Sequence, residues 1–240
     1  IAGPLLGAWM LSPAIAWWVS RAPRPDRSAL SDAEAESLRL TARRTWHFFE
    51  TFVTAEDNML PPDNYQEDPH PVVAHRTSPT NLGLYLLSVL AARDFGWLGL
   101  TSTVDRLEET FATMSRLERF RGHFYNWYDT RDLRPLDPRY ISSVDSGNLA
   151  GHLITLRSAC REMLATPVFH LESLAGIADA VKLARSALDA LAGDSRISEA
   201  ARKQLYFALD SFLASLKAPT VSPADFALRL SDLKQQSEVL

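Results

Sequence analysis

Cysteine is almost absent from this 240-residue sequence, in which Cys160 stands alone. The chain can therefore form no intrachain disulfide and no cysteine-based metal site, and a reducing compartment is the natural expectation. Its histidines at 75, 123 and 152 lack the spacing of metal ligands. No glycine-rich phosphate loop or nucleophile elbow is present either. We expect no metal and no cofactor.

A large excess of either charge is also missing. Lys and Arg number 25 against 29 Asp and Glu, which gives a net charge of −4. This balance offers no general electrostatic reason to bind nucleic acid, so we expect no such partner. With 46% hydrophobic and 22% charged residues, the composition is typical of a globular protein of one or two domains.

Charge is absent from the opening stretch IAGPLLGAWMLSPAIAWWVS, residues 1–20. A run of this length can span a bilayer, and the basic residues that follow it favour a cytoplasmic flank. A signal peptide fits poorly, because its basic residues should precede the apolar core. We predict that residues 1–20 are the end of a membrane-spanning region. The alternative is a buried segment packed on the domain, and two prolines weaken a single straight helix.

The first residue is Ile1 rather than Met, so we expect a piece of a longer protein or a processed product. Residues 21–30 are rich in Pro and Arg and predict a linker. Ser31 and Glu34 then form a capping-box pattern, which predicts the start of a helix that continues to residue 53.

Strand-type alternation is not evident in the sequence, and the predicted fold class is all-α. Amphipathic spacing predicts further helices at 81–96, 101–120 and 148–164. From residue 166 to 240 the chain consists of amphipathic segments with short breaks. This pattern predicts a helical hairpin or coiled-coil-like extension after a main domain at 31–165.

Unusual polar and aromatic residues gather between the predicted helices. Residues 54–80 contain five prolines and no helical period, and long ordered loops are usually functional. The stretch GHFYNWYDT, residues 122–130, combines four aromatics with an amide and a carboxylate, and VDSGNLAGHL follows at 144–153. Aromatic faces that pack on a pyranose ring, with carboxylates and amides that bind its hydroxyls, are the components of a sugar site.

The candidate substrate-binding residues lie in these loops and at the adjoining helix ends. They are Arg76, Thr77, Asn81, Tyr125, Asn126, Trp127, Asp129, Asp145 and Asn148. Glycoside chemistry needs two carboxyl groups, and the loops offer Glu67, Asp68, Asp129 and Asp145, which spacing alone does not pair. The catalytic residue is unknown, with Asp145 as the best candidate in this chain.

Simpler interpretations of the same residues stay open. Phe124 and Tyr128 fit a hydrophobic core as well as a ligand platform. Asp145 is equally suited to capping the helix that begins near Asn148. Arg76 fits a structural salt bridge, and His75 alone is more typical of a structural than a catalytic residue.

The sequence also resembles a known family. The residues that carry the resemblance are LSPAIAWWVSR (11–21), RTWHFFETFV and its continuation to GWLGL (44–100), and LERFRGHFYNWYDT and its continuation to GNLAGHL (117–153). They resemble bacterial cyclic β-1,2-glucan synthases, over about residues 1 to 165. These are large inner-membrane proteins that join a membrane glycosyltransferase region, a middle transglycosylase region and a C-terminal phosphorylase-like region.

The resemblance places this chain at the start of the middle region, on the cytoplasmic side, after the last membrane helices. It implies an (α/α)6-barrel fold and anomer-retaining transglycosylation that closes linear β-1,2-glucan into a ring. Such a barrel needs about twelve helices of ordinary length. We therefore expect an incomplete barrel here, with the family's catalytic glutamates beyond Leu240. The implied partners are the glucan chain, the rest of the same polypeptide and the membrane at the N-terminus.

Two other functions stay open. The chain fits a non-catalytic helical scaffold that links membrane and enzyme regions, in which the candidate residues would be scattered, or buried and satisfied. It also fits a membrane-tethered interaction domain that works through residues 170–240. Convergence of the loops at 61–81, 122–130 and 140–148 on one rim would favour the glucan enzyme.

Overall fold

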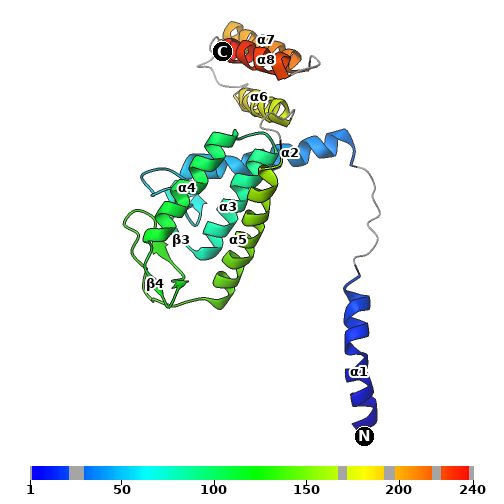
Figure 1. Ribbon diagram of the computed structural model, residues 1–240. Helices are drawn as coiled ribbons and strands as arrows, with labels where there is room; N and C mark the ends of the chain where they lie inside the picture. Colours follow the sequence, from blue (N-terminus) through cyan, green and yellow to red (C-terminus); the bar gives the residue numbers. More distant parts are fainter. Residues whose placement is uncertain (1, 22–29, 167–171, 192–197, 218–222, 238–240) are drawn as a thin grey trace. The chain divides into compact units, whose positions relative to one another are not determined.

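The computed structural model describes residues 2–21, 30–166, 172–191, 198–217 and 223–237. The chain divides into two compact units, Ile1–Ser37 and Leu38–Leu240. Helices make up most of the described residues, and the few strands are two residues long (Figure 1). The predicted all-α class is confirmed.

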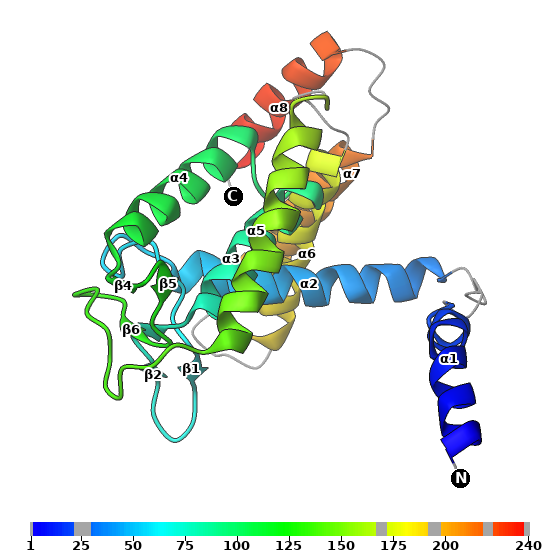
Figure 2. The ribbon, with the colours of Figure 1, turned by 60° about the horizontal axis from the view of Figure 1, so that its bottom comes forward.

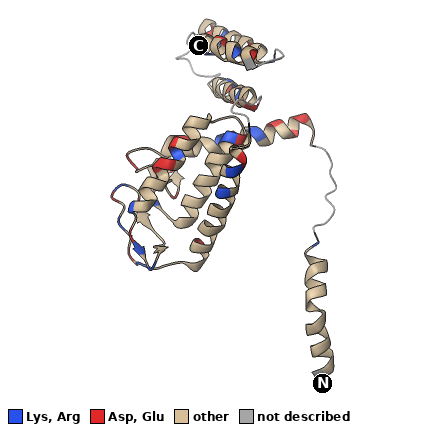
Figure 3. Ribbon diagram, in the orientation of Figure 1, with Lys and Arg blue, Asp and Glu red and all other residues tan. Residues whose placement is uncertain are grey.

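Helix α1 (Ala2–Val19) carries no charged residue, as Figure 3 shows. Within the described residues, no helix combines the length and the apolarity needed to cross a membrane. This finding corrects the expectation of a transmembrane helix within residues 1–20. At 1.5 Å per residue α1 is about 27 Å long, against a hydrocarbon core of about 30 Å, and its glycines and prolines dilute the apolar side chains. Most of the predicted linker, residues 22–29, lies outside the described part of the chain.

Helix α2 (Asp32–Phe52) begins at the predicted capping box. The Ser31 backbone N–H donates to Glu34 Oε2 at 2.8 Å, and the Glu34 N–H donates to Ser31 Oγ at 3.3 Å. These hydrogen bonds with Ser31 lower the pKa of Glu34. Trp46 is the buried residue of this helix and joins the main hydrophobic cluster.

Three helices build the main cluster: α3 (Pro79–Asp94), α4 (Leu100–Arg116) and α5 (Ser143–Met163). Four side chains of α3, spaced three and four residues apart, are fully buried in it: Leu82, Tyr85, Leu86 and Val89. Helices α3 and α5 lie side by side (Figures 1 and 2). Thr80 contacts Asp145 near their first turns, whereas Leu90 and Met163 line one cavity near their last turns. The two helices are therefore parallel, and both begin at the same end of the cluster.

Three small antiparallel sheets lie at that end (Figure 2). Strand β1 (Tyr65–Gln66) pairs with β2 (Val72–Val73), β3 (Arg76–Thr77) with β6 (Tyr128–Asp129), and β4 (Arg119–Phe120) with β5 (His123–Phe124). Two-residue strands are too short to show alternation, which is why the sequence did not reveal them.

Helices α6 (Glu172–Ala190), α7 (Glu199–Leu216) and α8 (Pro223–Ser237) form the predicted helical extension. They share a second hydrophobic cluster, made of Leu174, Val181, Leu188, Leu209, Phe212, Phe226 and Leu233. The Ser198 hydroxyl caps α7 by accepting from the Ala201 N–H at 3.1 Å.

Helix α6 contacts the loop between α3 and α4 through close backbone packing and one buried carboxylate. Gly96 adopts a φ of +80°, which favours glycine, and a Cβ added to Gly176 would meet the Gly96 carbonyl. Asp179 is 3% exposed and pairs with Arg39 Nε at 2.7 Å. It also accepts from Trp97 Nε1 at 2.8 Å. Glycine packing and this ion pair together fix α6 against the loop.

Candidate functional site

The three loops that carry the predicted site residues meet at the end where α3 and α5 begin. Strand pairing sets Arg76 opposite Asp129. The Asn126 N–H donates to the Tyr140 carbonyl at 2.9 Å, which joins the second loop to the third. Thr80 Oγ1 donates to Asp145 Oδ1 at 2.6 Å, which joins the third loop to the first. We refer to residues 61–81, 122–130 and 140–148 as the rim.

Asp145 lies in the first turn of α5, and its carboxylate is held from two sides. One oxygen accepts from Thr80, and the other accepts from the Asn126 amide nitrogen at 2.9 Å. The helix cap is Ser142, whose hydroxyl accepts from the Asp145 N–H at 3.1 Å. The interpretation of Asp145 as a simple cap is therefore wrong. Its carboxylate faces α3, where the partial positive charge of two parallel helix starts favours an anion.

Asn126 connects Asp145 to two aromatic rings. Its buried amide satisfies all its neighbours when the nitrogen faces Asp145. The amide oxygen then accepts from Trp127 Nε1 at 2.8 Å and from the Tyr140 hydroxyl at 2.6 Å. One amide thus fixes the positions of a tryptophan, a tyrosine and a carboxylate.

Thr80 and Asn148 extend this network along the helix pair. The Thr80 hydroxyl donates to Asp145 and accepts from Asn148 Nδ2 at 3.2 Å. Asn148 is exposed, so its amide oxygen faces a solvent-accessible part of the rim.

Arg76 lies over the Trp127 ring, with its guanidinium carbon 4.8 Å from the ring centre. Its Nε and Nη2 atoms donate to Asp63 Oδ2 at 3.1 and 2.8 Å. Asn81 Nδ2 donates to the other oxygen of Asp63 at 3.3 Å. The predicted salt bridge of Arg76 is confirmed. Its guanidinium covers one face of the half-buried Trp127 ring.

Three of the predicted residues are placed differently. Thr77 is fully buried in β3, and its hydroxyl lacks a hydrogen-bond partner among the described residues. Tyr125 packs against the main cluster, and its N–H donates to the Tyr128 hydroxyl at 2.7 Å. Asp129 Oδ1 accepts from the Arg131 N–H at 2.8 Å and shapes the turn that follows. The structure groups these three with the packing of the rim rather than with the Asp145 network.

Tyr128 and Phe124 belong to the core, as the simpler interpretation held. Tyr128 is fully buried and donates from its hydroxyl to the Glu118 carbonyl at 2.6 Å. Burial raises its pKa to about 12. Phe124 is partly buried and meets the Tyr128 ring edge-on, with ring centres 6.3 Å apart.

His75 takes part in a second network, separate from that of Asp145. Its Nδ1 lies 2.7 Å from Asp57 Oδ1, and its Nε2 lies 2.7 Å from Arg131 Nη2. Arginine can only donate, so Nε2 accepts and the imidazole proton on Nδ1 points to Asp57. The same Asp57 oxygen accepts from Thr130 at 2.5 Å. These contacts favour the structural interpretation of His75.

Glu67 and Asp68, the other carboxylate candidates, are exposed in the β1–β2 hairpin. Four residues of the rim were missed from the sequence: Asp63, Thr80, Tyr140 and Ser142. The sequence held a signal for two of them, Ser142 and Thr80. Ser142 precedes the start of a helix and Asp145 follows it three residues later, and Thr80 likewise follows the helix cap Ser78 by two residues.

The comparison with known proteins decides between families. No family model matches the sequence. The chain is 50% identical, over 217 residues and 90% of its length, to the cyclic beta-(1,2)-glucan synthase NdvB of Rhizobium meliloti (strain 1021). The resemblance to cyclic β-1,2-glucan synthases is confirmed. The chain spans only 8% of that relative's length.

The rim carries hydrogen-bonding and aromatic side chains. The described residues contain no group of His, Cys, Asp and Glu side chains that could hold a metal ion. The rim instead presents a carboxylate, two amides, a guanidinium and two aromatic rings. These are the groups that bind the hydroxyls and the apolar face of a sugar.

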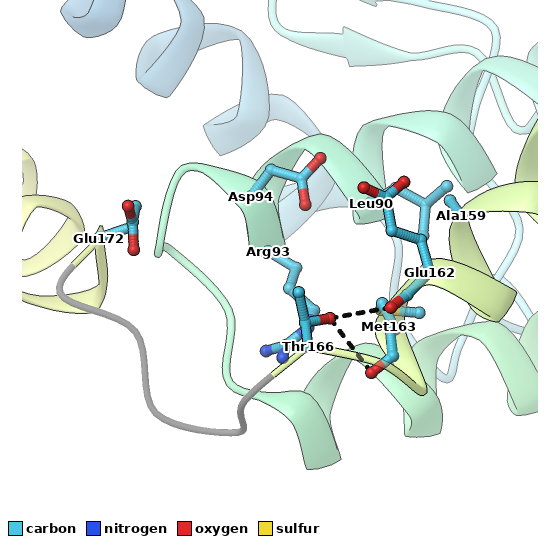
Figure 4. A pocket seen from close by; sticks show the side chains of 8 residues that line it. All are labelled: Leu90, Arg93, Asp94, Ala159, Glu162, Met163, Thr166 and Glu172. Atoms are coloured by element: carbon cyan, nitrogen blue, oxygen red, sulfur yellow. Dashed lines mark hydrogen bonds between the residues drawn. The ribbon is translucent and has the colours of Figure 1, made fainter. Parts of the chain in front are cut away.

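A cavity of about 320 Å³ lies far from the rim, where α3 and α5 end (Figure 4). Arg93 lines it together with three carboxylates, from Asp94, Glu162 and Glu172. Thr166 closes one side by donating to the Glu162 carbonyl at 3.1 Å. The predicted site residues do not line this cavity.

Proposed function

We propose that this chain is part of a carbohydrate-active glycosyltransferase that acts on β-1,2-glucan. In this proposal the rim lines the glucan-binding cleft during retaining transglycosylation, which closes the linear chain into a ring. Identity of 50% to a cyclic β-1,2-glucan synthase supports the substrate class. The observation that carries the site is the Asp145 carboxylate, held by donors from two other segments beside an aromatic pair.

Asp145 acts in this proposal as an acceptor for sugar hydroxyls. Thr80 and Asn126 each use one lone pair of a different oxygen, so each oxygen keeps capacity for a further hydrogen bond. Arg76 and Asn148 add donors beside it, and Trp127 offers its uncovered face. The catalytic glutamates lie beyond Leu240 in this proposal, in later helices that complete an (α/α)6 barrel begun by α2–α5.

The proposed location is the bacterial inner membrane, with the rim on the cytoplasmic side. Helix α1 supports membrane association at the N-terminal flank, because it is uncharged and exposes large apolar side chains. These are Leu5, Leu6, Trp9, Met10, Leu11, Ile15, Trp17, Trp18 and Val19. Exposed apolar surface of this extent marks a contact site.

The test uses the complete protein that contains this chain, incubated with linear β-1,2-glucan, with product masses followed over time. Ring closure releases products lighter by one water than linear chains of the same number of glucose units. Asp145→Asn removes the charge and keeps the shape, and we expect about tenfold slower ring formation or worse. Asp137→Asn is the matched control, because Asp137 lies in the same loop region with a side chain 91% exposed.

Unchanged ring formation by Asp145→Asn would remove this residue from the cleft. Absence of rings from the unmodified, folded protein would overturn the enzyme proposal. The second candidate is the helical scaffold, which one observation favours: Arg76 and Asn81 are satisfied by Asp63, and Thr77 is buried. A scaffold predicts that linear β-1,2-glucan does not bind to the chain at all.

A further inference from the structure

A shallow groove of about 470 Å³ opens within the rim, between strand β5 and the first turns of α5. Its lining residues are His123, Ile141, Ser143, Ser146 and Gly147. The volume falls within the range of small-molecule sites. An imidazole and two hydroxyls can each donate and accept hydrogen bonds, while the isoleucine supplies apolar contact. This combination suits a ligand that is rich in hydroxyls.

Gly147 forms the floor of the groove on α5. A Cβ added there would meet no atom within 4 Å, so the space above this helix face is open. Glycine weakens a helix relative to alanine, because its backbone loses more freedom on folding. Packing in the described structure does not require a glycine at this position, and a larger side chain here would extend into the groove.

Tyr140 stands next to the groove and joins it to the Asp145 network. It directly precedes Ile141, and its side chain is 47% exposed. Its hydroxyl donates to the Asn126 amide oxygen at 2.6 Å, and its carbonyl accepts from the Asn126 N–H at 2.9 Å. An exposed ring held at its polar end keeps a fixed face for stacking. Trp127 has lost one such face to Arg76, so Tyr140 is the less obstructed platform of the two.

We propose that the groove at His123, Ser143, Ser146 and Gly147 is an additional subsite for a glucose unit of the glucan, with Tyr140 as its ring platform. This inference rests on the proposed function, since it assigns a binding place to a further glucose unit of the glucan that the rim binds. The subsite positions the glucan and takes no part in bond making. It makes binding depend on His123, Ser143, Ser146 and Gly147, which take no part in the Asp145 network.

The test fills the groove without disturbing the fold. The complete protein that contains this chain is titrated calorimetrically with linear β-1,2-glucan oligosaccharide, in its unmodified form and as the variants Gly147→Ala and Gly147→Leu. We expect Gly147→Leu to weaken binding about tenfold. Gly147→Ala should weaken it much less, because the smaller side chain fills less of the groove. Gly151→Leu is the matched control, one turn along the same helix and equally open, but outside the groove. It should leave Kd within about twofold.

Two further variants separate the ring of Tyr140 from its hydroxyl. Tyr140→Ala removes the platform and should weaken binding about tenfold. Tyr140→Phe keeps the ring, loses the hydrogen bond to Asn126 and should lie between Tyr140→Ala and the unmodified protein. Circular dichroism confirms that each variant is folded.

The outcomes are distinguishable. Binding that is lost in Asp145→Asn but unchanged in Gly147→Leu and Tyr140→Ala would overturn the subsite and leave the proposed function standing. Equal weakening by Gly147→Leu and Gly151→Leu would assign the effect to the whole α5 face and would also overturn it. An unmodified complete protein that binds no glucan would overturn both proposals.

Discussion

The two hydrophobic clusters of the protein differ in how deeply they bury their residues. In the cluster built on α3, α4 and α5, Leu82, Tyr85, Leu86 and Val89 are all 0% exposed. In the cluster of α6, α7 and α8, every buried hydrophobic residue keeps between 4% and 9% exposure. The deeper cluster also carries the long loops, and the shallower one has short breaks between helices. Irregular loops with many polar contacts need a well-shielded core to hold them in place.

The loops themselves make up for their lack of regular structure with side-chain hydrogen bonds. Asn58 shows this well, since its amide donates to the Thr130 and Arg131 carbonyls at 2.8 Å each. Backbone groups that no helix or strand satisfies are thereby paired. The extension needs few such devices because most of its described residues are helical.

The largest expected effect tests the difference in burial directly. Leu86→Ala should lower the free energy of unfolding of the main cluster by about 3–5 kcal/mol, whereas Leu209→Ala should lower that of the extension by about 2 kcal/mol. Hydrogen exchange of the α3 and α7 amides measures the two separately. Equal losses would break the comparison between a deep and a shallow cluster.

Tyr128→Phe should cost the main cluster about 2–4 kcal/mol, because the Tyr125 N–H and the Glu118 carbonyl both lose their partner. Chemical denaturation monitored by circular dichroism measures this loss.

The buried hydroxyl of Tyr128 also predicts that stability depends on pH. Its pKa rises from 10.0 to about 12 on folding, so its contribution is complete below pH 10 and is lost as the pH rises toward 12. This difference in pKa corresponds to about 3 kcal/mol. The unfolding free energy of Tyr128→Phe should therefore fall less steeply than that of the unmodified protein between pH 10 and 12. Parallel slopes would contradict the burial of this hydroxyl.

Asp179→Asn should loosen the contact between α6 and the α3–α4 loop, at a cost of about 2 kcal/mol. The estimate is below that for a fully buried pair, because the Arg39 side chain is 27% exposed and water can replace part of the interaction. Faster hydrogen exchange in α6, with unchanged exchange in α3, is the expected result. Asp232→Asn, at an exposed position on α8, serves as a control for the lost charge. Unchanged exchange in α6 would show that glycine packing alone holds the helix.

The smallest stability effect is expected at the rim. Thr80→Val keeps the side-chain shape and removes the donor to Asp145, which should cost about 1–2 kcal/mol. The folded variant should also bind glucan more weakly, because the Asp145 carboxylate is no longer held by Thr80. Thr101→Val, at an exposed site in α4, is the control for the substitution itself. Calorimetric Kd values of the two variants provide the measurement, and equal values would remove Thr80 from the site.

Much of the helical framework could be predicted because its signals are local. The Ser31 and Glu34 capping box and the apolar spacing in the extension each depend on residues a few positions apart. The three small sheets could not be predicted, since their strands are two residues long and pair across loops. The absence of charge suggested a transmembrane helix within residues 1–20, whereas the small residues within α1 lower its apolarity.

The candidate site was predictable in its residue types but not in its contacts. Asn126, Trp127 and Asp145 were recognisable as polar and aromatic residues in loops. Their connection depends on Thr80 and Tyr140, whose hydroxyls reach them only because α3 and α5 lie parallel. Parallel packing of helices 65 residues apart leaves no local signal, so neither residue stood out.

The meeting of Gly96 and Gly176 also determines the register of α6. A shift of one residue would bring Ala175 or Ile177 against the Gly96 carbonyl, and each of these carries the Cβ that the contact excludes. The same shift would move Asp179 by about 1.5 Å along the helix axis and turn it away from Arg39 and Trp97. Helix α6 therefore cannot slide along the α3–α4 loop without losing these contacts. Any insertion or deletion between Met163 and Gly176 must be absorbed before the glycine, because the contact accepts one alignment.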